Sequence, residues 1–319
     1  MDQAGFPAAT GSRLAWSLLP GRIVAAVEER LGSRIVQAHD RPGGFSPGAA
    51  ARLRLADGRA AFVKAVAGEL NPSSPDMHRA EARITAALPA TAPVPGFLFL
   101  HDDGDWVALG LEAVDGGEPA VPWEAEELGR VLTAVADLHG ALTPPPVDAP
   151  RLGDRLGSQF RNWRDLASGR FPVADATDPW AVRNLERLAG LESRWEEAAA
   201  GDTLLHGDLR ADNILLTPDR VVFVDWPHAA LGAPWVDLVF LAPSVAMQGG
   251  PEPEVLFDGH PSARAAPARA VDAVVAALAG YFHVRGMLPS PPGLPTLRAF
   301  QAAQGVQAVA WLRRRTGWD

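Results

Sequence analysis

In the stretch HGDLRADNILLTPDRVVFVDW, residues 206–226, charged and amide side chains flank two short runs of apolar, partly β-branched residues. The runs NILL and VVFV surround a Thr-Pro-Asp-Arg turn, and this pattern predicts a small β-hairpin. Asp208 precedes the hairpin in a loop, Asn213 follows five positions later, and Asp225 closes the hairpin twelve positions after Asn213. Because a hairpin brings its two ends together, we expect these three side chains to face one cavity.

Two carboxylates and one amide in such a cavity suit phosphoryl transfer. This reaction needs a carboxylate beside the attacking hydroxyl, oxygen ligands for magnesium, and cations over the phosphates. The stretch 206–226 can supply most of these groups from one loop and one hairpin. The chain contains no cysteine, so any chemistry has to come from carboxylates, histidines, hydroxyls or lysines.

HGDLRADNILL and VVFVDW resemble the catalytic and metal-binding loops of the aminoglycoside phosphotransferase family. Protein kinases carry HRD and DFG at the corresponding places, where this chain has HGD and DW, and that difference favours a small-molecule acceptor. The resemblance runs from about Ile35 to Met247. It implies an α+β, protein-kinase-like fold of two lobes: a small β-sheet lobe with a helix, and a mostly helical lobe.

The resemblance also implies a role for each polar residue of the stretch. Asp208 becomes the group that orients the acceptor hydroxyl and accepts its proton, while Asn213 and Asp225 become magnesium ligands. Arg210 lies two positions after Asp208, where it is expected to neutralise charge that develops on the γ-phosphate. Asp208 and Arg210 are therefore the predicted catalytic residues.

Other residues are expected to support this site without reacting. Asp237 in GAPWVDLVFL matches an aspartate that braces the catalytic loop, and His206 is expected to brace the same loop by hydrogen bonding. The remaining histidines are scattered without HxxxH or HExxH spacing, so no zinc site is predicted. Trp163, Trp180 and Trp195 are expected to pack between helices in the segment that would shape an acceptor pocket.

The amino-terminal part offers nucleotide-binding groups in kinase order. Lys64 in AFVKAV resembles the strand lysine that contacts the α- and β-phosphates, and Glu81 in HRAEARI resembles its helix partner. GGFSPG, residues 43–48, lies between two predicted strands, where a phosphate-covering loop belongs, although its spacing departs from GxGxxG. Residues 111–114 resemble the hinge whose main-chain groups bind the adenine edge. The expected nucleotide-binding residues are Lys64, Glu81, Gly43, Gly44, Ser46, Gly48, Glu112 and Val114.

Hydrophobic periodicity predicts the elements of both lobes, which we place at residues 1–111 and 112–319. The predicted elements of the first lobe are helices at 23–31 and 77–88 and the strands IVQAH, ARLRL, AFVKAV, GFLFL and WVALGLEAV. The predicted helices of the second lobe cover residues 124–139, 159–166, 180–200, 262–284 and 297–315.

The composition restricts the partners. A net charge of −9 argues against nucleic-acid binding, which normally requires a basic face, and it is compatible with a cationic substrate. No uncharged run approaches the roughly 20 residues that cross a membrane. The amino terminus MDQAGFPAAT has no basic segment followed by an apolar one, so a cytoplasmic monomer or homodimer is expected.

The expected reaction is transfer of the γ-phosphoryl group of ATP, or of GTP, with Mg²⁺ to a hydroxyl of a small molecule. An aminoglycoside-like antibiotic is the first acceptor considered, because the family resemblance favours it. A sugar, an amino alcohol or an amino acid is the alternative acceptor, since one site can serve all of them. A non-catalytic pseudokinase is a further alternative, against which stands the complete set of base, metal ligands and lysine.

Overall fold

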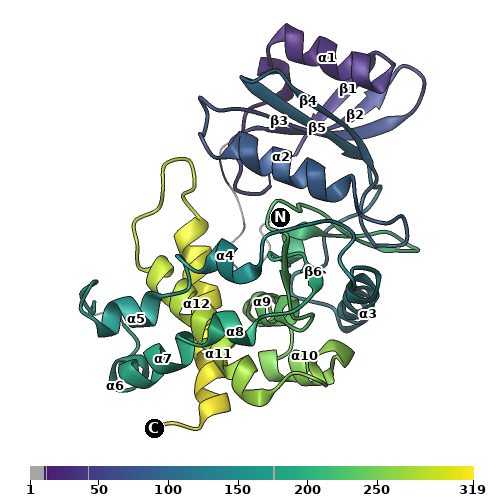
Figure 1. Cartoon of the computed structure of the whole chain (residues 1–319). Helices are drawn as coiled ribbons and strands as arrows, with labels where there is room; N and C mark the ends of the chain where they lie inside the picture. Colours follow the sequence, from purple (N-terminus) through teal and green to yellow (C-terminus); the bar gives the residue numbers. More distant parts are fainter. Residues whose placement is uncertain (1–10, 12, 42, 175–176) are drawn as a thin grey trace.

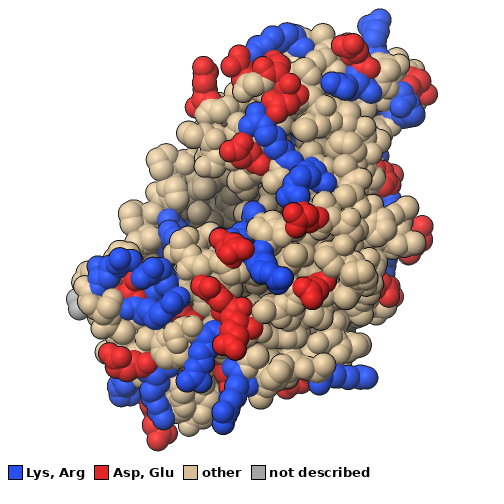
Figure 2. All heavy atoms as spheres, viewed as in Figure 1, with Lys and Arg blue, Asp and Glu red and all other residues tan. Residues whose placement is uncertain are grey.

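The computed structural model describes residues 11, 13–41, 43–174 and 177–319, and they form two lobes (Figure 1). The β-sheet belongs to the amino-terminal lobe, and most helices belong to the carboxy-terminal lobe. The space-filling view shows a hollowed surface between the two lobes (Figure 2). Among the described residues, none of the helices combines the length and apolar character that a bilayer-spanning segment needs.

The amino-terminal lobe is built on a five-stranded antiparallel sheet with the strand order β1-β2-β3-β5-β4. Apolar and polar side chains alternate in ARLRL, so one face of this strand is buried. The predicted Asp57-Gly58 turn joins β2 to β3, and Gly58 adopts a φ of 87°, which favours glycine. The strands are β1 (Ile35–Asp40), β2 (Ala49–Leu55), β3 (Ala60–Ala67), β4 (Phe97–Asp102) and β5 (Trp106–Glu112).

Two helices cover opposite faces of this sheet. Helix α1 (Gly21–Leu31) packs Ile23 into a cluster with Ala108 of β5. Helix α2 (Ser74–Thr85) packs against Leu109, the next residue of the same strand. Because neighbouring residues in a strand point to opposite faces, the sheet lies between the two helices (Figure 1).

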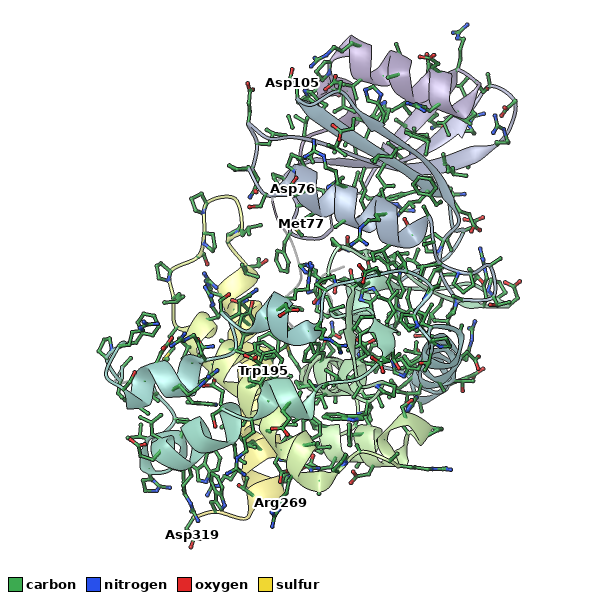
Figure 3. The ribbon with its side chains drawn as sticks, viewed as in Figure 1. Asp76, Met77, Asp105, Trp195, Arg269 and Asp319 are labelled. Atoms are coloured by element: carbon green, nitrogen blue, oxygen red, sulfur yellow. The ribbon has the colours of Figure 1, made fainter. Side chains whose placement is uncertain are left out.

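The carboxy-terminal lobe encloses a large apolar core among its helices. Trp163, Trp180 and Trp195 are buried in this core, so they pack between helices as expected, and Trp195 points into the lobe (Figure 3). The helices are α3 (Ala125–Ala141), α4 (Leu152–Leu156), α5 (Asn162–Ala167), α6 (Pro179–Arg183), α7 (Leu185–Glu192), α8 (Trp195–Ala198), α9 (Val236–Met247), α10 (Pro253–Gly259), α11 (Ala268–Gly286) and α12 (Leu297–Thr316). The short strand pairs are β6 (Thr203–Leu205) with β9 (Ala230–Gly232) and β7 (Ile214–Leu216) with β8 (Val221–Phe223).

The single helix predicted at 180–200 is wrong, because this segment forms the three short helices α6, α7 and α8. The first break occurs at Asn184, whose side-chain amide donates to the carbonyls of Trp180 at 3.1 Å and of Asp319 at 2.9 Å. An asparagine that bonds to main-chain groups competes with helical geometry. The break thus coincides with a contact between residues 135 positions apart.

Other helices differ from the prediction as well, and α4 and α10 are absent from the predicted helices. Helix α11 begins at Ala268 rather than at 262, because the extended residue Pro267 precedes it and residues 261–263 form a separate 3-10 turn. Helix α9 was not predicted as an element of its own. It is buried on nearly every side, so its sequence lacks the alternation of apolar and polar positions that identifies a surface helix.

Candidate active site

The loop that carries Asp208 follows β6 and is fixed by the start of helix α9. The carboxylate of Asp237, fully buried, accepts hydrogen bonds from the amides of His206 and Gly207, both at 2.9 Å. Burial raises the pKa of this carboxyl, but the neighbouring imidazole of His139 and the loop amide outweigh that effect and lower it. Asp237 therefore braces the loop as an ionised acceptor of two hydrogen bonds.

His206 fixes the same loop from inside. Its Nδ1 accepts from the amide of Asp208 at 3.3 Å, which leaves Nε2 to donate to the carbonyl of Val224 at 2.9 Å. This pair of hydrogen bonds connects the Asp208 loop to the strand that precedes Asp225. The imidazole thus holds the two predicted acidic groups at a fixed separation.

Asp208 is paired with Arg210. Arg210 Nη1 lies 2.7 and 2.8 Å from the two carboxylate oxygens of Asp208, and its other nitrogens bond to Asp212 at 2.9 and 3.0 Å. Burial lowers the pKa of Arg210, but the two carboxylates outweigh burial and raise it above its ordinary value. Asn213 Nδ2 donates to the main-chain carbonyl of Asp208 at 2.8 Å, so Asn213 Oδ1 is turned away from that bond.

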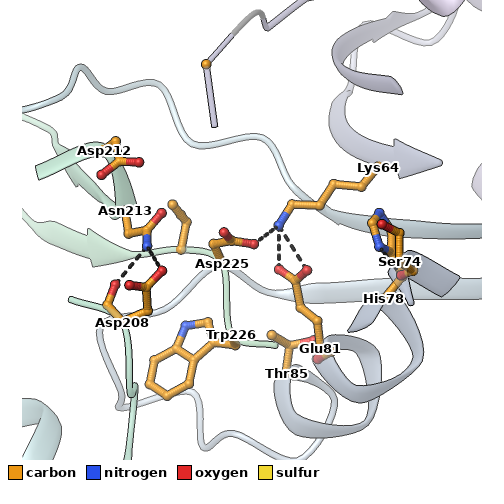
Figure 4. Close-up of polar contacts among 12 residues, drawn as sticks. Lys64, Ser74, His78, Glu81, Thr85, Asp208, Asp212, Asn213, Asp225 and Trp226 are labelled. Carbon is orange, nitrogen blue, oxygen red and sulfur yellow. Dashed lines mark hydrogen bonds and ion pairs between the residues drawn. The ribbon is translucent and has the colours of Figure 1, made fainter. Parts of the chain in front are cut away.

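Lys64, Glu81 and Asp225 form a second cluster of charges (Figure 4). Lys64 Nζ lies 2.8 and 2.9 Å from the carboxylate oxygens of Glu81 and 2.6 Å from Asp225 Oδ1. Burial lowers the pKa of Lys64, but the two carboxylates raise it by more. For Asp225 the effects have the opposite signs: burial raises the pKa of its carboxyl, and the ammonium of Lys64 lowers that pKa by more. Lys64 is therefore a cation and Asp225 an anion in this cluster.

The backbone at Asp225 is unusual. Its φ is 70°, in the left-handed region that residues other than glycine rarely adopt. Such conformations occur where the surrounding structure requires them, often at functional sites. The turn directs the Asp225 carboxylate to Lys64, while the next residue, Trp226, packs against the His206 ring at 4.7 Å.

The donor atoms present fit a magnesium ion. Asp225 Oδ2 and Asn213 Oδ1 are hard oxygen ligands, and magnesium commonly uses one or two protein oxygens together with substrate phosphates. Figure 4 shows Asn213 next to Asp208, with Asp225 on the side toward Lys64. Among the described residues there is no cluster of three His, Asp or Glu side chains that would hold a metal without a substrate.

The predicted phosphate-covering loop at 43–48 lies against β3 and above the Asp208 loop. A Cβ atom at Gly48 would stand 2.5 Å from the carbonyl oxygen of Ala65, so only glycine fits there. Gly44 adopts a φ of 85°. The hydroxyl of Ser46 is buried and has no hydrogen-bond partner among the residues that the structure describes.

Some main-chain groups of the predicted hinge, residues 111–114, already form hydrogen bonds within the protein. The amide of Glu112 donates to the Gly96 carbonyl at 2.7 Å, and the carbonyl of Val114 accepts from Arg52 at 2.9 Å. In the described part of the chain, the amide of Val114 has no acceptor. The predicted hinge therefore retains one main-chain donor without an acceptor among the described residues.

Several residues of the cleft were missed by sequence reasoning. Phe300 of α12 meets Phe45 of the glycine loop edge-on at 6.0 Å, and the Arg210 guanidinium lies 5.6 Å from the Phe300 ring centre. Arg13 approaches the glycine loop from the amino-terminal segment. These contacts join residues far apart in sequence, so no local motif signals them.

The sequence profile of the phosphotransferase enzyme family matches residues 41–270, more than half of the chain. The chain belongs to this family. This confirms the family predicted from HGDLRADN and VVFVDW. A curated relative, acyl-CoA dehydrogenase family member 10 of Mus musculus, is 27% identical over 209 residues, which is 59% of this chain. The chain spans only 18% of that relative's length.

Solved structures of this phosphotransferase family share the fold. The ternary complex of a thermostable mutant of aminoglycoside phosphotransferase APH(4)-Ia with AMP-PNP and hygromycin B has a TM-score of 0.59 at 14% identity, covering 92% of this chain and 98% of that chain. Amicoumacin kinase hAmiN, in complex with AMP-PNP, Ca²⁺ and Ami, gives 0.56 at 9% identity, with coverage of 92% and 94%. A choline/ethanolamine kinase family protein from Mesorhizobium loti gives 0.54 at 17% identity, with coverage of 82% and 84%. The predicted two-lobed α+β fold is confirmed.

Proposed function

We propose that this phosphotransferase moves the γ-phosphoryl group of ATP, or of GTP, to a hydroxyl of a small molecule in a magnesium-dependent reaction. The observation that carries the proposal is the convergence of Asp208, Asn213 and Asp225 with the Lys64–Glu81 ion pair. Residues 1–111 would bind the nucleotide, and residues 112–319 would supply the catalytic loop, the metal ligands and the acceptor pocket. The complexes of fold relatives with AMP-PNP support the nucleotide part by analogy.

Each group would have one task. Asp208 orients the acceptor hydroxyl, and its carboxylate takes the hydroxyl proton as the new O–P bond forms. The bond from the γ-phosphorus to the β–γ bridging oxygen breaks, and its electron pair leaves with the nucleoside diphosphate. Lys64 contacts the α- and β-phosphates, and Arg210 neutralises charge on the transferred group.

Asn213 and Asp225 would hold the magnesium ion, which, when bound, neutralises charge on the phosphate oxygens. The ion pair with Lys64 uses Asp225 Oδ1 and leaves Oδ2 for the metal. On the nucleotide side, the amide of Val114 would bind the adenine edge, and the main chain of the loop at 43–48 would cover the phosphates.

The acceptor side of Asp208 carries hydrogen-bond donors. Arg155 of α4 donates to His228 Nδ1 at 3.2 Å, and since a guanidinium only donates, the proton of His228 resides on Nε2. Burial lowers the pKa of His228, so the ring is neutral, and the carboxylates of Asp208 and Asp225 act on it. His228 Nε2–H is therefore a donor close to the reacting groups.

Arginine side chains surround Tyr281, which we assign to a second part of the acceptor pocket. Arg285 lies 5.7 Å from its ring centre, and Gln301 links its hydroxyl to Arg298 through hydrogen bonds of 3.4 and 2.7 Å. Burial raises the pKa of Tyr281, and the charges of Arg285, Asp208 and Arg298 all act on it. In the described part of the chain, neither Arg285 nor Arg298 has a carboxylate partner.

The positive charges of Arg285 and Arg298 would affect aminoglycoside and metabolite acceptors differently. An aminoglycoside is a polycation, and at Tyr281 it would meet Arg285 and Arg298, which have no carboxylate partner among the described residues. An amino acid or another hydroxylated metabolite with an anionic group would instead pair with them. The arrangement favours a metabolite acceptor over the antibiotic, although hygromycin B occupies the APH(4)-Ia relative.

The test is magnesium-dependent consumption of ATP and of GTP against a panel of aminoglycosides, sugars, amino alcohols, amino acids and hydroxy acids. Acceptor-dependent turnover that disappears in Asp208→Ala would support the phosphotransferase and identify the acceptor class. Nucleotide binding without turnover on any acceptor would favour the pseudokinase. Absence of nucleotide binding would reject the proposed function.

A further inference from the structure

The amino-terminal segment reaches the nucleotide side of the cleft. Trp16 is buried in the core of the first lobe, and its amide donates to Asp40 at 2.9 Å. The amide of Leu14 donates to the carbonyl of Pro47, in the glycine loop, at 3.0 Å. The segment is therefore anchored beside the phosphate-covering loop.

Gly11 continues this segment between the two lobes. A Cβ atom at Gly11 would stand 2.9 Å from the Leu294 side chain, in the loop before α12, and 3.2 Å from the Gly44 carbonyl oxygen. Gly11 therefore lies in close contact with a loop of each lobe.

Arg13 extends from this segment beneath the glycine loop. Its Nε donates to the carbonyl of Gly43 at 2.5 Å, and its Nη2 would stand 2.5 Å from a Cβ atom at Gly44. Glycine at position 44 therefore lets the guanidinium lie directly against the loop. The backbone of the loop and the side chain of Arg13 form one surface.

The charge of Arg13 is not compensated by an ion pair. Burial lowers its pKa, and the carboxylates of Asp225 and Glu81 offset this effect only in part. Both carboxylates bond instead to Lys64, at 2.6 and 2.8 Å. Among the described residues, no carboxylate lies within ion-pair distance of Arg13. In the part of the chain that the structure describes, this half-buried guanidinium makes a single hydrogen bond, to the Gly43 carbonyl, and its other N–H groups are available to an anion.

We propose that Arg13 binds the β- or γ-phosphate of the nucleotide from beneath the glycine loop. This inference rests on the proposed function, since it places Arg13 and Lys64 on the same polyanion. Ser46 agrees with it, because its buried, unpartnered hydroxyl in the same loop would gain an acceptor from a phosphate oxygen. Arg13 thereby supplies a cation that kinase-like motifs do not reveal.

The alternative is that Arg13 occupies the phosphate position and competes with the nucleotide. The two interpretations predict opposite signs for Arg13→Ala. A phosphate contact predicts weaker binding of ATP, whereas a competing side chain predicts tighter binding. A purely structural role predicts equal losses for nucleotides and for adenosine.

The experiment measures the affinities of the full chain for ATP, ADP and adenosine by calorimetry with Mg²⁺ present. We expect Arg13→Ala to weaken ATP binding by roughly tenfold or more, as for loss of charge-assisted hydrogen bonds, and to change adenosine binding by less than about twofold. Arg13→Lys should retain part of the ATP affinity, since it keeps the charge without the planar fork. Arg22→Ala, which removes an exposed arginine paired with Asp103 and Asp105 in the same lobe, is the matched control.

The outcomes separate this inference from the proposed function. ATP binding unchanged or strengthened in Arg13→Ala would overturn the role of Arg13 while the wild-type acceptor assay still stands. An equal loss for adenosine would overturn it as well. A selective loss of ATP affinity would support Arg13 even if no acceptor were phosphorylated, and a wild type that binds no ATP would overturn both.

Discussion

Asp208 and Asp225 have different partners, and this difference suits two tasks. Arg210 contacts both oxygens of Asp208, while Asp225 shares Lys64 with Glu81. The first carboxylate thus lies beside a cation within the catalytic loop, where an acceptor hydroxyl can approach. The second is tied to the sheet of the other lobe, where phosphates would lie. The division explains why changes at the two residues should affect different steps.

Asp208→Asn should reduce turnover without reducing nucleotide affinity. The amide has nearly the same shape but cannot accept the acceptor proton, and loss of such a group costs about 10²–10⁴-fold in rate. The measurement is kcat together with the Kd for ATP. Asp212→Asn is the control, because it removes the other carboxylate partner of Arg210 and keeps Asp208. Undiminished turnover of Asp208→Asn would contradict the assignment.

His78 makes stability depend on pH. Its ring is buried in α2, with Nδ1 3.0 Å from the Ser74 carbonyl, and burial together with the charge of Lys64 lowers its pKa to about 4. A histidine in the unfolded chain has a pKa of about 6.5, so the unfolded state binds the proton first as pH falls. Stability should therefore fall as pH drops from 6.5 toward 4.

His78→Gln should remove about 2 kcal/mol of the stability difference between pH 7 and pH 5. Denaturant unfolding at the two pH values measures this difference for the wild type and the variant. His39→Gln, at an exposed position of β1, is the control and should leave the difference unchanged. If His78→Gln shows the full wild-type difference, the buried neutral state of His78 is refuted.

The glycine loop packs closely against β3 at Gly48, so the distance between the loop and the strand depends on this residue. A side chain there would collide with the Ala65 carbonyl and with Val66, the two residues that follow Lys64 in β3. Gly48→Ala should therefore destabilise the protein by about 1–3 kcal/mol and weaken ATP binding. Gly21→Ala, at the start of α1 in the same lobe, is the matched control, since a Cβ atom at Gly21 has open space. If the two changes have equal effects on thermal unfolding and on the Kd for ATP, the predicted clash of a Cβ atom at position 48 with β3 does not determine stability or binding.

Sequence predicted the elements that depend on local pattern. The hairpin of β7 and β8 and the strand with Lys64 follow from apolar alternation and turn residues. In the structure, Lys64 Nζ lies 2.6 Å from Asp225 Oδ1, just after this hairpin. The break at Asn184 was not predictable from local pattern, and the Asn184 side chain bonds to Asp319, 135 positions away. The approach of Arg13 to the glycine loop spans 30 positions, so the site was incomplete in sequence alone.

The two lobes meet across the cleft through aromatic side chains. Phe300, buried in α12, contacts Phe45 of the glycine loop, and Arg210 of the catalytic loop lies near both rings, at 5.6 and 5.8 Å. This contact links the part that covers phosphates to the part that carries Asp208. Because the charged groups of the proposed reaction come from both lobes, their alignment depends on such interlobe contacts.

Phe300→Ala should lower both stability and nucleotide affinity. Truncation of a buried phenylalanine costs about 3–5 kcal/mol, and loss of one aromatic pair and one cation–π contact across the lobes should raise KM for ATP by roughly tenfold. Phe257→Ala is the matched control, because Phe257 is equally buried but packs against Trp235 and Trp311 within the carboxy-terminal lobe. It should lower the Tm to a similar extent and leave KM for ATP nearly unchanged. If both variants lose stability and neither changes KM, the Phe45–Phe300 contact supports packing alone, and the glycine loop holds the nucleotide without it.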